Sequence, residues 1–265
     1  MTILGYLAFI FMGLSLGMIG GGGSILTVPI LVYLLKIDPI LSTAYSLFVV
    51  GSTALVGGFF YLKRGEVDLR TGAIFALPSF VAVYLVRSLV VPNLPEQVVS
   101  LGGFHFTKSL LVMAIFAILM LLASSSMIRK TKTSQGVEMS PVMKFLVIAL
   151  EGFLVGGVTG FVGAGGGFLI IPALVVLVGL PMRIAVGTSL LIISAKSLVG
   201  FTGDLQHQAY IDWTLLWTVT GIAIVGLLIG TQLSSRVSDE KLKTGFGYFT
   251  LVMGTLILID QIAKL

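Results

Sequence analysis

Long apolar stretches follow one another along almost the whole chain. Ten runs are apolar, at about 3–19, 24–35, 40–62, 71–91, 106–128, 142–162, 167–180, 184–203, 213–233 and 244–263. Only 10% of the residues are charged, whereas a soluble domain has about 25%, so polar side chains are too few to form a water-facing surface. Because a spanning helix needs about 20 apolar residues, this pattern predicts an all-α membrane protein.

The second and seventh apolar runs are shorter than the others, and each follows a cluster of glycines. The clusters are Gly20, Gly21, Gly22 and Gly23 in the first case, and Gly163, Gly165, Gly166 and Gly167 in the second. Each glycine costs about 1 kcal/mol in a helix interior relative to alanine, so we expect the helices to break there. The short runs are then either short spans or arms of re-entrant hairpins.

The two glycine clusters belong to two copies of one pattern. Residues 13–58 align without a gap to residues 156–201, at an offset of 143 positions (156 − 13), with about 15 identities in 46 pairs. One residue of slippage later, the sequence around Asp68 resembles that around Asp212. A duplicated membrane half is typical of transporters with internal repeats. We therefore expect an N-terminal repeat at 1–128, a cytoplasmic linker at 129–141 and a C-terminal repeat at 142–265.

The distribution of basic residues favours one orientation in the membrane. Cytoplasmic loops are enriched in Lys and Arg, which places the linker inside. Alternating the spans then puts further basic residues on that side: Lys63, Arg64, Arg70, Arg183, Arg236, Lys241 and Lys243. The loops at 91–104 and 205–212 contain no Lys or Arg and fall outside with both termini. Because each half has five runs, an odd number, we expect the second repeat to be inverted relative to the first. The expected location is the inner (cytoplasmic) membrane.

The glycine clusters are candidate binding elements for an anion. A helix N-terminus presents unpaired N–H groups and the positive end of the helix dipole, and each cluster opens a short helix, carrying Pro29 or Pro172. Two such ends from inverted halves can converge near the middle of the membrane. The alternative is that the glycines only allow close helix packing.

Lys196 is the most informative single residue, because it lies deep inside the run 184–203, seven residues (203 − 196) from its nearer end. A charge at that depth is costly and is usually functional. Ser189 lies seven residues earlier on the same helix face, and the repeat counterparts of these two residues are Thr53 and Ser46. One fixed charge surrounded by hydroxyl groups is expected to line an anion site.

Two acidic residues offer alternative roles. Glu151 and Asp204 are each a candidate ion-pair partner that would hold Lys196 for structural reasons only. Glu151 is also a candidate carrier of a coupled proton, because burial raises the pKa of a carboxyl group. Arg87 and Lys108 lie near the outer ends of their runs, and we expect their long side chains to reach toward the membrane surface. The alternative is that either residue attracts anions to the entrance.

Several function classes are disfavoured by what the chain lacks. It has no cysteine, which removes disulfides and thiol ligands, and its two histidines have no metal-ligand spacing. No cofactor or metal site is therefore expected. The net charge of +5 reflects cytoplasmic loops rather than nucleic-acid binding. No paired nucleophile and base is evident, so an enzyme is not expected.

The glycine clusters and the stretches around them resemble the sulfite exporter TauE/SafE family. The resemblance is carried by Gly20–Pro29, Gly163–Pro172, the segment from Ala185 to Leu191, the segment from Gly200 to Asp204, and Ile211-Asp212-Trp213. Members are associated with sulfite, sulfonates such as sulfoacetate, and related anions. Where many members carry Asn this chain has Lys196, and its lack of cysteine argues against the thiosulfate-uptake relatives.

The resemblance implies a secondary transporter that moves a small sulfur-containing anion by alternating access, with export as the expected direction. A passive anion channel would share every motif, and an accessory membrane subunit is disfavoured by the buried lysine. The expected partners are the lipid bilayer and a small anion, with proton or ion coupling left open. The sequence does not fix the oligomeric state.

Overall fold

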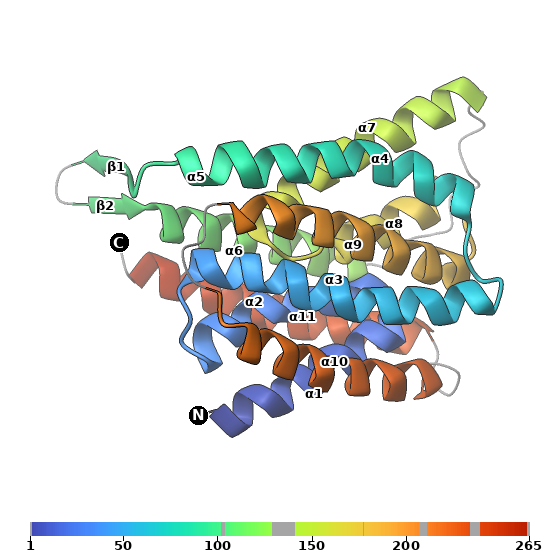
Figure 1. Cartoon of the computed structure of the whole chain (residues 1–265), viewed down its shortest axis with the longest axis horizontal. Helices are drawn as coiled ribbons and strands as arrows, with labels where there is room; N and C mark the ends of the chain where they lie inside the picture. Colours follow the sequence, from blue (N-terminus) through green and yellow to red (C-terminus); the bar gives the residue numbers. More distant parts are fainter. Residues whose placement is uncertain are drawn as a thin grey trace.

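The computed structural model describes residues 2–101, 104–128, 141–176, 178–206, 211–233 and 239–263. Long helices run side by side along the longest axis of the molecule (Figure 1). The eight long helices are α1 (Thr2–Ile19), α3 (Pro39–Lys63), α4 (Leu69–Leu85), α6 (Lys108–Ile128), α7 (Pro141–Val162), α9 (Met182–Leu205), α10 (Trp213–Leu233) and α11 (Asp239–Ala263). The shorter elements are η1 (Gly20–Leu26), α2 (Thr27–Pro29), η2 (Ile30–Leu34), η3 (Val86–Val90), α5 (Val91–Asn93), β1 (Gln97–Leu101), β2 (Phe104–Thr107) and α8 (Gly167–Val176).

The all-α membrane fold is confirmed. Within the described residues, seven helical segments are long and apolar enough to cross a bilayer. They are Ile3–Leu34 (α1 together with the apolar segment that follows it), Pro39–Lys63, Leu69–Asn93, Lys108–Ser125, Phe145–Val162, Met182–Leu205 and Trp213–Leu233, and Gly247–Ala263 is a shorter apolar helix. Large apolar side chains such as Leu4, Leu122 and Trp217 remain half or more exposed, as a surface that faces lipid requires.

The sequence interpretation missed a β-hairpin in the loop at 91–104. Strands β1 and β2 pair in antiparallel fashion, with Ser100 opposite His105 and Leu101 opposite Phe104. Two glycines separate the strands in the sequence, a typical signal of a tight hairpin. The hairpin lies at the same end of the molecule as both termini (Figure 1).

Both glycine clusters interrupt a helix and reverse the chain, as expected. Gly20 (φ +72°) ends α1, and Gly163, Gly165 and Gly166 (φ +65° to +76°) separate α7 from α8, a backbone conformation that only glycine adopts readily. After the first cluster the chain returns along α1, so that a side chain at Gly5 would lie 3.2 Å from Leu35 Cγ. The segment from Gly20 to Leu34 is therefore the second arm of a hairpin.

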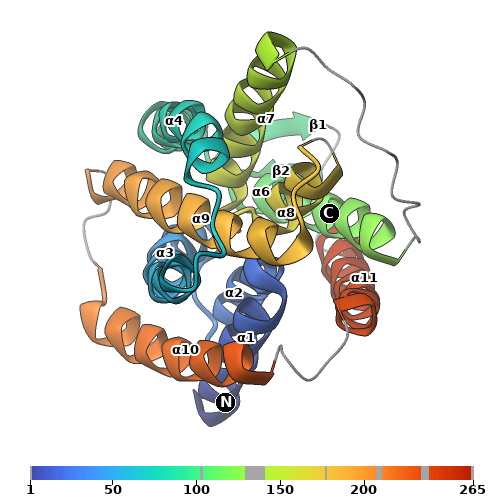
Figure 2. The ribbon, with the colours of Figure 1, turned by 90° about the vertical axis from the view of Figure 1, so that its right-hand side faces the viewer.

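The helices pack in pairs that follow the sequence duplication. The offsets of 143 and 144 positions make α1 the counterpart of α7, and α4 the counterpart of α10. In the structure α1 packs along α10, and α7 packs along α4. Helices α3 and α9 lie between these two pairs, and α6 packs along α11 to one side (Figure 2). Individual contacts follow the same relation. Gly17 contacts Leu227, and Gly160, the counterpart of Gly17, contacts Val83, the counterpart of Leu227.

Two hydrogen bonds between the halves are also counterparts of each other. The backbone N–H of Asp68 donates to Thr188 Oγ1 at 2.9 Å, and that of Asp212 donates to Tyr45 Oη at 2.7 Å. Tyr45 and Thr188 differ by 143 positions. Each aspartate also caps the helix that follows it, accepting from Thr71 N or from Leu215 N. This reciprocity supports the proposal that the two halves are duplicates.

The two ends of the bundle carry different connections and chain ends. Both termini and the β-hairpin lie at one end, and the α3–α4 connection lies at the other (Figure 1). The exposed basic residues Lys63 and Arg64 belong to that second end, as does Arg183 at the start of α9. The linker residues 129–140 and the loop residues 207–210 lie outside the described part of the chain.

Candidate functional site

The two glycine-containing turns meet in the interior of the protein. A side chain at Gly21 would overlap the Cα atom of Gly167, and one at Gly167 would overlap the Cα atom of Gly21. Gly20 to Gly23 and Gly163 to Gly167 are all buried. The backbones therefore touch directly at this crossing. Close packing accounts for Gly21 and Gly167, whereas the positive φ of Gly163, Gly165 and Gly166 is a separate requirement of the second turn.

Lys196 lies at this crossing, in the middle of α9. Its side chain is 1% exposed, and Nζ donates to Thr159 Oγ1 on α7 at 2.6 Å. A Cβ atom at Gly166 would lie 2.7 Å from the same Nζ. The ammonium group is therefore held against the second glycine turn, at the N-terminus of α8, where the N–H groups of Leu169 and Ile170 donate to the Gly166 carbonyl.

Neither acidic residue proposed from the sequence pairs with Lys196. Among the described residues, no carboxylate lies within 4.0 Å of Lys196 Nζ, and Asp204 instead pairs with Arg87, with Oδ1 lying 3.3 Å from Nη1. The idea that Asp204 neutralises Lys196 is therefore wrong. Glu151 is half-buried and lies eight residues before Thr159, about 12 Å along α7, so it does not neutralise Lys196 either.

Helix α3 carries two buried hydroxyl groups opposite α9, and one of them, that of Thr53, lies level with Lys196. Ser46 and Thr53 are fully buried on α3, and neither hydroxyl has a hydrogen-bond partner among the described residues. Helices α3 and α9 run antiparallel, with Gly51 beside Leu198 and Gly57 beside Leu190, which puts Thr53 and Lys196 at the same depth. By contrast, the Ser189 hydroxyl donates to the Val186 carbonyl at 2.8 Å.

Arg87 is a second buried cation that the sequence interpretation placed wrongly. It lies in η3, it is 0% exposed, and Nη1 also donates to Thr43 Oγ1 at 2.9 Å. The expectation that this side chain extends to the membrane surface is therefore wrong, and Lys108, for which the same is expected, is only 7% exposed. The signal that could have identified Arg87 is the opposite charge of Asp204 at the outer end of another apolar run.

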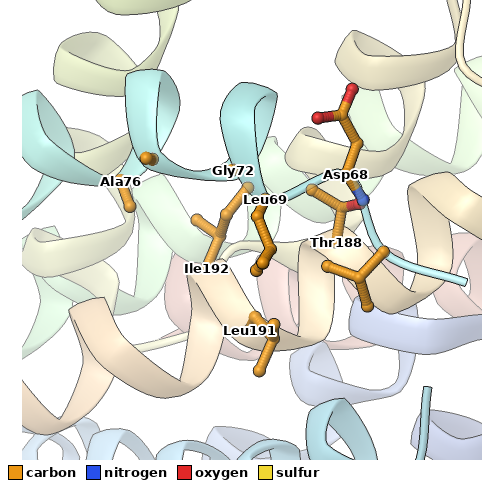
Figure 3. Close-up of a pocket in the computed structure, with 9 residues that line it drawn as sticks. Asp68, Leu69, Gly72, Ala76, Thr188, Leu191 and Ile192 are labelled. Atoms are coloured by element: carbon orange, nitrogen blue, oxygen red, sulfur yellow. The ribbon is translucent and has the colours of Figure 1, made fainter. Parts of the chain in front are cut away.

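A pocket of about 200 Å³ opens at the other end of the bundle, between α4 and α9. Its lining is mostly apolar and includes Leu69, Leu191 and Ile192 (Figure 3). The carboxylate of Asp68 points away from Leu191 (Figure 3) and accepts hydrogen bonds from Thr71 instead. No basic side chain lines this pocket, and none of the proposed site residues lines it.

Comparison with known proteins gives one consistent result. The family model described as "Sulfite exporter TauE/SafE" matches residues 5–257. A "Probable membrane transporter protein" of Xylella fastidiosa (strain 9a5c) is 30% identical over 256 residues, which cover 96% of this chain and 93% of that protein. The "Probable membrane transporter protein YunE" of Bacillus subtilis (strain 168) is 24% identical over 277 residues, covering 98% and 99%. No solved structure matches the chain.

Proposed function

Because the chain belongs to the sulfite exporter TauE/SafE family, we propose that it is a secondary transporter that moves a small sulfur-containing anion across the inner membrane. Sulfite and sulfonates are the expected substrate class, and export is the expected direction. The seven apolar helical segments and the relatives described as membrane transporters support a multi-pass transporter.

The observation that carries the proposal is the unpaired charge of Lys196. A positive charge at the middle of a span costs about 2.5–3.5 kcal/mol on insertion scales, and the neutral hydroxyl of Thr159 is its only hydrogen-bond partner among the described residues. A charge that is buried without a carboxylate is strongly destabilising unless a counter-ion is bound. A transported anion is the counter-ion that we propose.

The residues around Lys196 supply the remaining contacts in this proposal. The N–H groups at the start of α8 favour an anion, and the unpartnered hydroxyl of Thr53, which lies level with Lys196, can donate to its oxygens. Ser46 lies level with Gly203, about two turns away along α9, so its hydroxyl would meet the anion only on the way to Lys196. The proposed substrate-binding set is Gly20, Gly21, Gly22, Gly23, Ser46, Thr53, Gly163, Gly165, Gly166, Gly167, Ser189 and Lys196. Alternating access would arise from the two inverted halves moving against each other at the glycine crossing.

Coupling to a proton is proposed for Glu151. It is a half-buried carboxyl group on α7, the helix that also carries the Thr159 partner of Lys196. A proton arriving at Glu151 changes the charge on α7 about two turns from the proposed site. Asp204 is a weaker candidate, because its carboxylate is engaged by Arg87.

A flux experiment tests the proposal. The protein is reconstituted in liposomes, and sulfite or ethanesulfonate uptake is measured with a substrate gradient alone and with a proton gradient added. A coupled transporter concentrates the anion when the proton gradient is applied, whereas a passive anion channel only equilibrates it. The variant Lys196→Met should lose this flux. Lys108→Met, which removes a buried lysine on α6, is the matched control and should retain it.

A further inference from the structure

The guanidinium group of Arg87 has one occupied side and one free side. Nη1 is held between Thr43 Oγ1 at 2.9 Å and Asp204 Oδ1 at 3.3 Å. Nε and Nη2 are buried and have no hydrogen-bond partner among the described residues. A buried donor without a partner is energetically costly, and more so when it carries charge. Two such donors on one fixed group therefore indicate a missing acceptor.

The free side of Arg87 has the shape of an oxyanion site. Nε–H and Nη2–H point in the same direction from the planar guanidinium group, and this fork matches two oxygens of one carboxylate, sulfonate or similar group. The contacts of Nη1 with Thr43 and Asp204 fix the plane of the fork in advance. We propose that the Nε and Nη2 atoms of Arg87 form a second oxyanion site, distinct from the one at Lys196.

The position of Arg87 relates this site to Lys196. A side chain at Gly203 would lie 3.0 Å from Arg87 Cβ, and Gly203 follows Lys196 by seven residues, which is two turns or about 10 Å along the same face of α9. The second glycine turn connects the two cations. Its Gly163 contacts Thr43, which Arg87 binds, and its Gly166 contacts Nζ of Lys196.

The two cations therefore form successive positions along one side of α9. Arg87 belongs to the end of the bundle that carries the termini and the β-hairpin, so an anion at this end meets Arg87 first. The charge of Asp204 leaves the Arg87 pair neutral overall, which keeps binding weak enough for the anion to move on to Lys196. This step-by-step role rests on the proposed function, whereas oxyanion binding by Arg87 does not require transport.

The test is a binding titration on the purified full-length protein in detergent. Calorimetry measures the dissociation constant for ethanesulfonate and for chloride in the parent, in Arg87→Lys, in Lys196→Met and in the double variant. Lysine keeps the positive charge beside Asp204 but lacks the fork. We expect Arg87→Lys to weaken ethanesulfonate binding at least tenfold in the Lys196→Met background, and to leave chloride binding within about twofold.

A second variant guards against loss of folding. Arg87→Gln combined with Asp204→Asn removes both charges together, so no charge is left unpaired, and it should fold while also losing ethanesulfonate binding in the Lys196→Met background. Equal ethanesulfonate affinity with and without the fork would overturn the Arg87 site and leave the proposed function standing. If Lys196→Met alone abolished all ethanesulfonate binding, the second site would likewise be excluded. Ethanesulfonate bound by Arg87 but not transported would instead contradict the proposed function only.

Discussion

Nζ of Lys196 donates to the hydroxyl of Thr159 at 2.6 Å, which joins the middle of α9 to the helix α7 that ends at the second glycine turn. No carboxylate among the described residues is within ion-pair distance of this group. The contact positions the ammonium group but does not neutralise it. If Lys196 has only a structural role, removing its charge should lower stability. If it binds the substrate, removing its charge should leave the protein stable but abolish binding.

We expect Lys196→Met to be at least as stable as the parent. Methionine has a similar length but no charge, so the substitution removes a cost of about 2.5–3.5 kcal/mol on insertion scales and loses one hydrogen bond. Thermal unfolding in detergent and the yield in the membrane fraction measure this. A large fall in unfolding temperature would mean that a carboxylate pairs with Lys196 in the folded protein, and adding Glu151→Gln should then restore stability.

The glycine crossing should tolerate no side chain where the backbones touch. Gly167→Ala places a methyl group on the Cα atom of Gly21, and overpacking of this kind costs about 1–3 kcal/mol, so the unfolding temperature should fall. Gly157→Ala on α7 is the control, because nothing lies within 4 Å of a Cβ atom there. Equal stability of both variants would show that the crossing does not pack as described.

A substitution at Gly22 tests whether the first glycine cluster binds the substrate or only allows close packing. We expect Gly22→Leu to reach the membrane but to lose transport, since a bulky side chain fills the space where backbone N–H groups approach the anion. Flux in liposomes and membrane yield are measured together. Normal flux would leave Gly22 with a packing role only.

Asp204 should matter for stability because it neutralises a fully buried arginine. Asp204→Asn leaves the charge of Arg87 without a carboxylate, and breaking a buried pair typically costs about 3–5 kcal/mol. The double variant Arg87→Gln with Asp204→Asn should recover much of this loss. Thermal unfolding of the single and double variants forms a mutant cycle, and additive effects would contradict the ion pair.

The orientation of the two halves predicts a labelling pattern. The chain has no cysteine, so single cysteines can be placed at Ser134 in the linker and at Gln206, which is exposed beyond α9. An impermeant thiol reagent should label them from opposite sides of the membrane, with Ser134→Cys reacting on the cytoplasmic side. Labelling of both from one side is incompatible with the inverted repeats.

Features that depend on local patterns in the chain could be predicted from the sequence. Features that depend on contacts between distant segments could not. Apolar run length predicted the helices, and glycine content predicted the breaks at Gly20 and Gly163, because both are local properties of the chain. The burial of Arg87 was missed because distance from the end of an apolar run measures depth, whereas its packing is set by Thr43 and Asp204.

The candidate site shows the same division. The depth of Lys196 in its span could be predicted, and so could its counterpart Thr53, from the offset of 143 positions. Its contact with Thr159 could not, because α8 lies between α7 and α9 in the chain, and the turn from α7 to α8 follows a path that depends on the positive φ angles of Gly163, Gly165 and Gly166. The β-hairpin was overlooked because its strands are short and follow an expected loop.

The most direct test of the account is the affinity of Lys196→Met for a sulfur oxyanion. Calorimetric titration of purified parent and variant with sulfite compares the two proteins, with Lys196→Arg as a third sample that keeps the charge but changes its shape. The account predicts a folded Lys196→Met protein that has lost tight sulfite binding and transport, and a Lys196→Arg protein that binds weakly. A folded Lys196→Met protein with the sulfite affinity of the parent would contradict the proposed site.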